Sequence, residues 1–151
     1  MLATIRQFPE SQIYVGTVAY GQDIHRSIEA YCDERDIKMA WVQCLGALSQ
    51  ATLAFYTQDT HQYVEKEFAG QYEIVQGAGN ISQKEGKAFA HLHMTLSGHD
   101  FACVGGHLMP EKTAIFACEF IVLALSGAEA FSRDAPDAQT GLNLWPSCPI
   151  N

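Results

Sequence analysis

The sequence has few basic residues and no apolar segment of membrane-spanning length. Nine Lys and Arg face seventeen Asp and Glu, so the formal net charge is −8. The basic residues are scattered, with no two adjacent, and a chain of this charge repels the phosphate backbone of nucleic acids at long range. The longest apolar run, Ala114–Leu125, falls short of the roughly 20 residues that a membrane helix needs, and Glu119 interrupts it. These absences argue against a membrane protein and against nucleic-acid binding driven by overall charge.

Cysteine is also sparse, and its spacing matches no common motif. The five cysteines include no C-x-x-C pair: Cys32, Cys44, Cys103, Cys118 and Cys148. An odd number without that motif argues against a disulfide framework and against a zinc ribbon. Residues 1–10 contain no apolar stretch of signal-peptide length. We therefore expect cysteines that serve as small core residues and a protein of the reducing cytoplasm.

Strand patterns outnumber helix patterns along the chain. Asp23 is a suitable N-cap for one amphipathic helix that ends near Arg35, with apolar residues following at helical spacing. Strands are expected at Ile13–Val18, Lys38–Leu45, Ala51–Tyr56, Tyr63–Phe68, Tyr72–Val75, Phe89–Leu96, Phe101–Leu108 and Ala114–Leu125. A polar loop is expected at 77–86, and the nearly all-apolar last strand is expected to be central and buried on both faces.

Most of the expected connections are too short for crossovers between parallel strands. The pattern therefore predicts an α+β fold, a mostly antiparallel β-sheet with one or two packed helices in a single compact domain. We expect that domain to span residues 1–151, with a core at about 13–125 and a loop-rich C-terminal tail at 126–151.

Histidines give the most specific signal in the sequence. Side chains alternate between the two faces of a strand, so His91 and His93 share one face, while Leu92 and the other apolar residues of the strand share the opposite face. A turn near Gly98 would bring His107 back opposite this pair on a partner strand. Three neutral imidazoles in such a group suit Zn, Ni, Cu or Fe. The alternative is a polar sheet face that contains histidines by chance.

Several segments around these histidines together resemble a known family. They are Tyr72–Val75, Gly79–Ser82, the stretch Gly86–His93 with its His-Leu-His, and Gly-Gly-His-Leu at 105–108. In this order and spacing they resemble the PPC domain (plants and prokaryotes conserved, DUF296), in its prokaryotic stand-alone type, over about Ile13–Leu125. The resemblance implies a compact α+β domain, a homotrimer, and a metal ion, usually assigned as zinc, held by His91, His93 and His107. Plant members of the family bind A·T-rich DNA through an Arg-Gly-Arg-Pro core, which this sequence lacks.

Other polar residues are weaker candidates for chemistry. Glu119 stands alone in an apolar run, where a carboxylate is costly unless it is paired or metal-bound, so it could act as a general base or support a ligand histidine. An oligomer interface explains it equally well. Asn80, Ser82 and Lys87 flank the expected loop and could line a small-molecule pocket, although turn chemistry and solvation explain them too.

The sequence leaves three functions open. The first is a trimeric protein with a metal, expected to be zinc, whose free coordination position serves a small molecule; whether it is an enzyme stays undecided. The second is a DNA-binding regulator, which rests on family association alone and is disfavoured by the net charge. The third is a purely structural metal site that stabilises the domain or the trimer.

Overall fold

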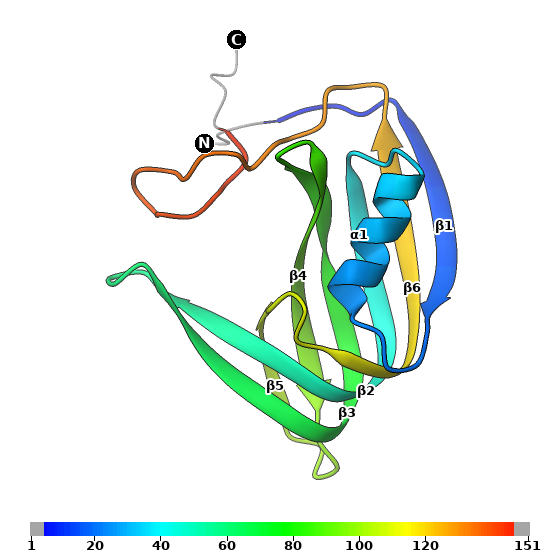
Figure 1. Cartoon of the computed structure of the whole chain (residues 1–151), viewed down its shortest axis with the longest axis vertical. Coiled ribbons are helices and arrows are strands. Elements are labelled where there is room, and N and C mark those ends of the chain that lie inside the picture. Colours follow the sequence, from blue (N-terminus) through cyan, green and yellow to red (C-terminus); the bar gives the residue numbers. More distant parts are fainter. Residues whose placement is uncertain (1–4, 147–151) are drawn as a thin grey trace.

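The computed structural model, which describes residues 5–146, is built on one six-stranded sheet with one helix on one of its faces (Figure 1). All pairs of the named strands are antiparallel, in the order β1-β6-β2-β3-β4-β5. The elements are β1 (Glu10–Val18), α1 (Ile24–Glu34), β2 (Ala40–Thr57), β3 (Gln62–Lys84), β4 (Lys87–Ser97), β5 (Cys103–Leu108) and β6 (Ala114–Ser126). The predicted fold class is confirmed, with one helix in the described part. That helix, at 11 residues, is too short to cross a membrane.

The helix α1 begins where the sequence predicted. The Asp23 side chain accepts a hydrogen bond from the Arg26 amide at 3.0 Å, which satisfies one free donor of the first turn. Its other carboxylate oxygen accepts from both the amide and the hydroxyl of Thr113, just before β6. One carboxylate therefore caps the helix and fixes it to the sheet. The helix buries Ile24, His25, Ile28 and Cys32.

Three predicted breaks between strands are wrong: the one after Leu45, the one between Phe68 and Tyr72, and most of the polar loop expected at 77–86. The strand β2 continues through Gly46 to Thr57, and β3 runs without a loop from Gln62 to Lys84. Gly79 shows why glycines here do not form turns: a Cβ at this position would clash with the carbonyl oxygen of His91 on β4. Gly46, Gly77 and Gly79 allow close approach between strands, a role that glycine often has inside sheets.

The long strands β2 and β3 form a hairpin arm that bends away from the rest of the sheet (Figure 1). On this arm β2 pairs a second time, with β5, through Leu53 opposite Leu108 and Ala54 opposite His107. A Cβ at Gly106 would lie 2.9 Å from the carbonyl oxygen of Ala54, so glycine is needed where the two strands meet. The second pairing brings β5 and the arm together beside β4.

The environment of β6 differs from the one that the sequence predicted. Its neighbours are β1 and β2, so it lies inside the sheet, but only one of its faces is buried, with Cys118 and Val122 beneath α1. The prediction that 114–125 is buried on both faces is wrong, because a sheet with one helix has one open face. That open face carries exposed apolar residues, which we name the apolar strip: Ile13, Val15, Trp41, Leu45 and Ile121.

Candidate metal centre

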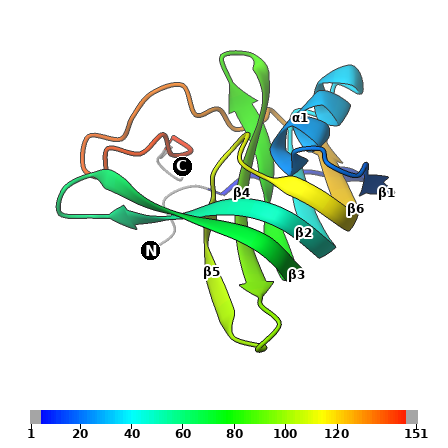
Figure 2. The ribbon, with the colours of Figure 1, turned by 60° about the horizontal axis from the view of Figure 1, so that its bottom comes forward.

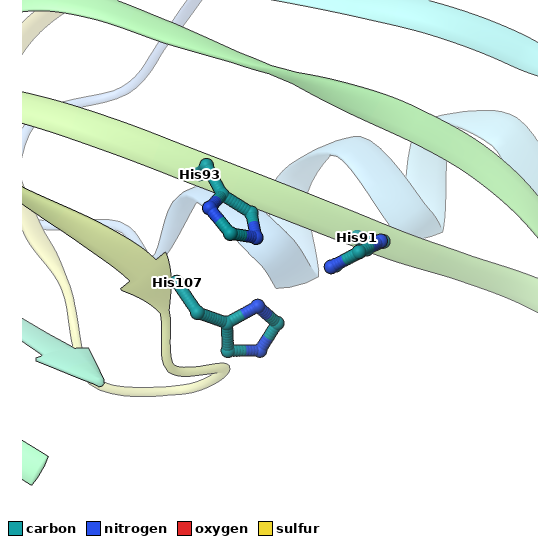
Figure 3. A group of neighbouring side chains, drawn as sticks. All are labelled: His91, His93 and His107. Carbon is teal, nitrogen blue, oxygen red and sulfur yellow. The ribbon is translucent and has the colours of Figure 1, made fainter. Parts of the chain in front are cut away.

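Three histidines converge on the open face of the sheet. One potential ligand nitrogen from each of His91, His93 and His107 lies within 4.8 Å of the others. Their ring centroids are 5.1 to 5.3 Å apart, and the rings face a common space (Figure 3). The convergence that the sequence predicted is confirmed.

Strand register explains this arrangement. His93 is directly opposite His107 in the β4–β5 ladder, and directly paired residues project from the same face of a sheet. His91 is two residues from His93, so it shares that face, while Leu92 between them is buried in the core on the other face. The geometry of one hairpin is thus enough to assemble all three imidazoles.

The backbone beside the histidines is held by the helix. The Ala88 and Ala90 amides donate to the side chains of Asp33 and Glu29 on α1, at 2.8 and 2.9 Å. Without these carboxylates, that stretch of β4 would leave two amides unpaired, which is costly in a partly buried position. The contact fixes the strand immediately before His91.

Burial keeps the three imidazoles in the neutral form. It lowers the pKa of His91 and His107 to about 4, with a further contribution from the positive charge of Arg133. Burial also lowers the pKa of His93, which is the most exposed of the three. Neutral imidazole is the form that binds a metal ion, so the site is ready to bind one at neutral pH.

The hairpin arm supplies one wall of the site. The Tyr63 ring stacks on His107, with centroids 5.2 Å apart and planes inclined by 27°. Burial raises the pKa of Tyr63, so its phenol stays protonated and can donate a hydrogen bond. A shallow hollow that includes His93 is lined by Gln76, Ala78, Thr95 and Gly105, and His93 is exposed, so the site is accessible from there.

Arg133, from the tail after β6, completes the site. Its Nη2 atom lies 3.4 Å from Nδ1 of His91 and 3.2 Å from Oδ1 of Asn80, and its Nε donates to the Ser82 hydroxyl at 2.9 Å. Arg133 is 7% exposed. It was absent from the sequence predictions, and no pattern around it could have revealed it, since it is a lone arginine in a loop-rich segment.

Pairing with β3 and aromatic packing hold the tail in place. The Gln83 amide donates to the Phe131 carbonyl, and the Arg133 amide donates to the Gln83 carbonyl, so the tail adds a short strand-like contact at the end of β3. The Phe131 ring stacks on Trp145, at 4.6 Å between centroids. Further along, the Tyr56 hydroxyl on the arm donates to the Thr140 carbonyl, and the tail curves toward the arm (Figure 2).

The remaining predicted residues divide into two groups. Asn80 and Ser82 lie at the site through their contacts with Arg133, although on a strand rather than on the expected loop. Lys87 is exposed at the start of β4 and is not part of the histidine group. Glu119 is exposed on β6, opposite Leu45 and Thr17, and the structure does not bring it to the histidines.

The donor set fits a transition-metal ion such as zinc. All three ligands are imidazoles, which suit zinc at about 2.0–2.1 Å, and they come from two adjacent strands of one chain. Three protein ligands leave a coordination position open, as in catalytic zinc sites and unlike closed structural ones. Such an ion would act as a Lewis acid or lower the pKa of a bound water.

Comparisons with known proteins agree with the fold and with the family resemblance. Residues 6–126 match the Plants and Prokaryotes Conserved (PCC) domain. A metal-containing protein from Archaeoglobus fulgidus is 39% identical, with a TM-score of 0.88, over 95% of this chain and 99% of its own. A plant- and prokaryote-conserved protein from Pyrococcus horikoshii shares the fold at 24% identity, with a TM-score of 0.86, over 97% of this chain and 99% of its own.

A third similar structure carries a different functional description. A proposed DNA-binding protein from Bacteroides thetaiotaomicron is 30% identical, with a TM-score of 0.79, over 89% of this chain and 92% of its own. No curated protein matches the sequence significantly.

Proposed function

The chain belongs to the Plants and Prokaryotes Conserved domain family, and on that basis we propose that it binds one divalent metal ion, preferentially zinc, through His91, His93 and His107. The observation that carries the proposal is the convergence of three imidazoles, all of lowered pKa, on one face of the sheet. The similar protein from A. fulgidus is metal-containing, which supports the same assignment. The bound ion would keep one coordination position for a small molecule.

Elemental analysis of untagged protein tests the metal proposal. We expect about one zinc per wild-type chain after purification or after zinc is offered, and none in a His91→Ala/His93→Ala variant. His99, at the tip of the β4–β5 hairpin and outside the histidine group, provides the matched control, because His99→Ala should retain the metal. Absence of metal from the wild-type protein after zinc is offered would refute the proposal.

We also propose that the protein assembles as a homotrimer and works in the cytoplasm. The support for assembly is the family and the apolar strip, in which Val15 is 75% and Ile121 43% exposed. Contiguous exposed apolar surface of this kind marks interaction sites in soluble proteins. The support for a reducing compartment is the use of Cys32, Cys44 and Cys118 as buried core residues.

DNA binding is the second candidate function, because a similar protein from B. thetaiotaomicron is a proposed DNA-binding protein. The net charge of −8 opposes it. A gel-shift titration with duplex DNA at about 50 mM salt tests DNA binding, since phosphate contacts are strongest at low salt. We expect no shift; a shift that weakens steeply with added salt would favour the regulatory function.

A further inference from the structure

Within residues 5–146, the guanidinium of Arg133 is a buried charge that pairs with no carboxylate. In the described part of the chain, 5–146, the ion pairs involve four other basic residues: Arg6, Arg26, Lys38 and Lys112. The acceptors of Arg133 are all neutral: the Ser82 hydroxyl, the Asn80 amide oxygen, the Asn143 carbonyl and a ring nitrogen of His91. Burial of an unpaired charge is costly, so a side chain whose purpose was only structural would be expected to have a carboxylate partner.

The histidine group next to it has no carboxylate either. The three ligands are neutral, so a divalent ion would bring two further positive charges into the site, beside Arg133. Glu29 and Asp33, on the helix, already accept the amides of Ala90 and Ala88. Among the described residues, no carboxylate pairs with Arg133 or belongs to the histidine group, so with the ion bound the site would carry an excess of positive charge that an added anion would balance.

Metal binding would also remove one hydrogen-bond acceptor from Arg133. A guanidinium only donates, so the contact at 3.4 Å is a hydrogen bond in the tautomer of His91 whose Nδ1 carries no proton. A neutral histidine that binds a metal through one nitrogen carries a proton on the other. Whichever nitrogen binds the ion, Nδ1 can then no longer accept, and an N–H of Arg133 is left without its partner, adjacent to the metal.

From this geometry we infer that the site takes a small carboxylate, which binds the metal ion through one oxygen and Arg133 through another. The inference rests on the proposed metal site. A planar guanidinium matches a carboxylate in shape and charge. The site has one cationic side chain and several aromatic neighbours: Phe89 and Trp145 pack under Arg133, and Tyr63 stacks on His107. This environment favours a singly charged organic anion over phosphate. Arg133 is thus a specificity-determining residue, and the substrate or ligand belongs to the small organic acids.

Anion binding to the cobalt-loaded protein tests this inference without an activity assay. Cobalt(II) is first shown to bind with one ion per chain, and acetate is then titrated while the visible spectrum of the ion is recorded. We expect Arg133→Met to retain cobalt and to bind acetate at least about tenfold more weakly, the loss expected for one charge-assisted hydrogen bond. Arg133→Lys should bind with intermediate affinity, because it keeps the charge and loses the planar fork.

Arg6→Met is the matched control. Arg6 also contacts the tail, over the Phe131 ring, but pairs with Glu129 and lies outside the site, so its replacement should leave acetate affinity unchanged.

Equal acetate affinity in wild-type and Arg133→Met protein, both holding cobalt, would overturn the inference. So would tighter binding of inorganic phosphate than of acetate by the wild type. If Arg133→Met does not fold, Arg133→Lys provides the test. Unchanged acetate affinity in Arg133→Lys would refute the role of the planar guanidinium. Failure of the wild type to bind cobalt or zinc would instead refute the metal site.

Discussion

Two ends of the open sheet face differ in chemistry although they belong to one continuous row of side chains. Directly paired residues lead across the sheet from Val15 to Ile121, Gln43, Ala78, His93 and finally His107. Such partners share a face, so the row starts in the apolar strip and ends in the histidine group. The arm, Arg133 and the tail cover the histidine end, whereas no described segment covers the apolar end.

The difference shows how one sheet face serves two kinds of recognition. Apolar side chains that stay exposed gain free energy when another apolar surface removes them from water. A group of imidazoles with no carboxylate among them is stabilised when a cation binds to it. In the proposed function, the first end contacts a second copy of the chain and the second end binds a metal ion with its ligand. The three experiments below test that separation, from the largest expected effect to the smallest.

Charges placed in the apolar strip should abolish assembly without affecting the metal. Val15→Asp/Ile121→Glu introduces two carboxylates into a surface that assembly would bury, which costs several kcal/mol per unpaired charge. Light scattering should therefore show monomers, while elemental analysis still shows metal, because all three ligands come from one chain. Phe101→Asp, at an exposed hairpin tip outside the strip, should assemble normally. Loss of the metal together with assembly would show that the two ends depend on each other.

The core behind the histidines should matter more for stability than the histidines themselves. Leu92 is 1% exposed, so Leu92→Ala removes buried methyl groups and should lower the free energy of unfolding by about 2–5 kcal/mol. His93→Ala, one residue away on the exposed face, should change the stability of the metal-free protein by less than about 1 kcal/mol. Urea denaturation in the presence of a chelator measures both. Similar losses for the two variants would contradict the assignment of His93 to the site rather than to the core.

A fourth histidine on the covered face should make stability dependent on pH. Burial lowers the pKa of His25 to about 4, and its Nδ1 has no hydrogen-bond partner in the described structure. The unfolded chain takes up this proton near pH 6.5 while the folded chain does not. Stability should therefore fall as the pH decreases from about 6.5 to about 4, by roughly 3 kcal/mol from this group.

His25→Leu, of similar size, isolates that contribution. Urea denaturation of the metal-free variant should show a loss over the same pH range that is smaller than the wild-type loss by about that amount. The same pH dependence in both proteins would place the responsible groups elsewhere, with the site histidines as the first candidates.

The sequence alone determined the features that depend on local pattern. The alternation of His91, Leu92 and His93 fixed which side chains share a face, and the distance to His107 matched a simple hairpin, so the group could be predicted before the structure. Asp23 likewise marked the start of the helix because its capping contact is local. The family motifs added the expected metal and trimer.

Only the tertiary structure decided the features that depend on segments far apart in the chain. Arg133 reaches His91 because the tail pairs with Gln83 and packs through Phe131, and nothing in the neighbourhood of Arg133 in the sequence encodes that return. β3 continues through Gly79 because β4 lies close beside it. Glu119 is exposed because the helix covers only the other face of the sheet. Local pattern sets the direction of a side chain, whereas burial and charge balance are set by the neighbours that the complete fold supplies.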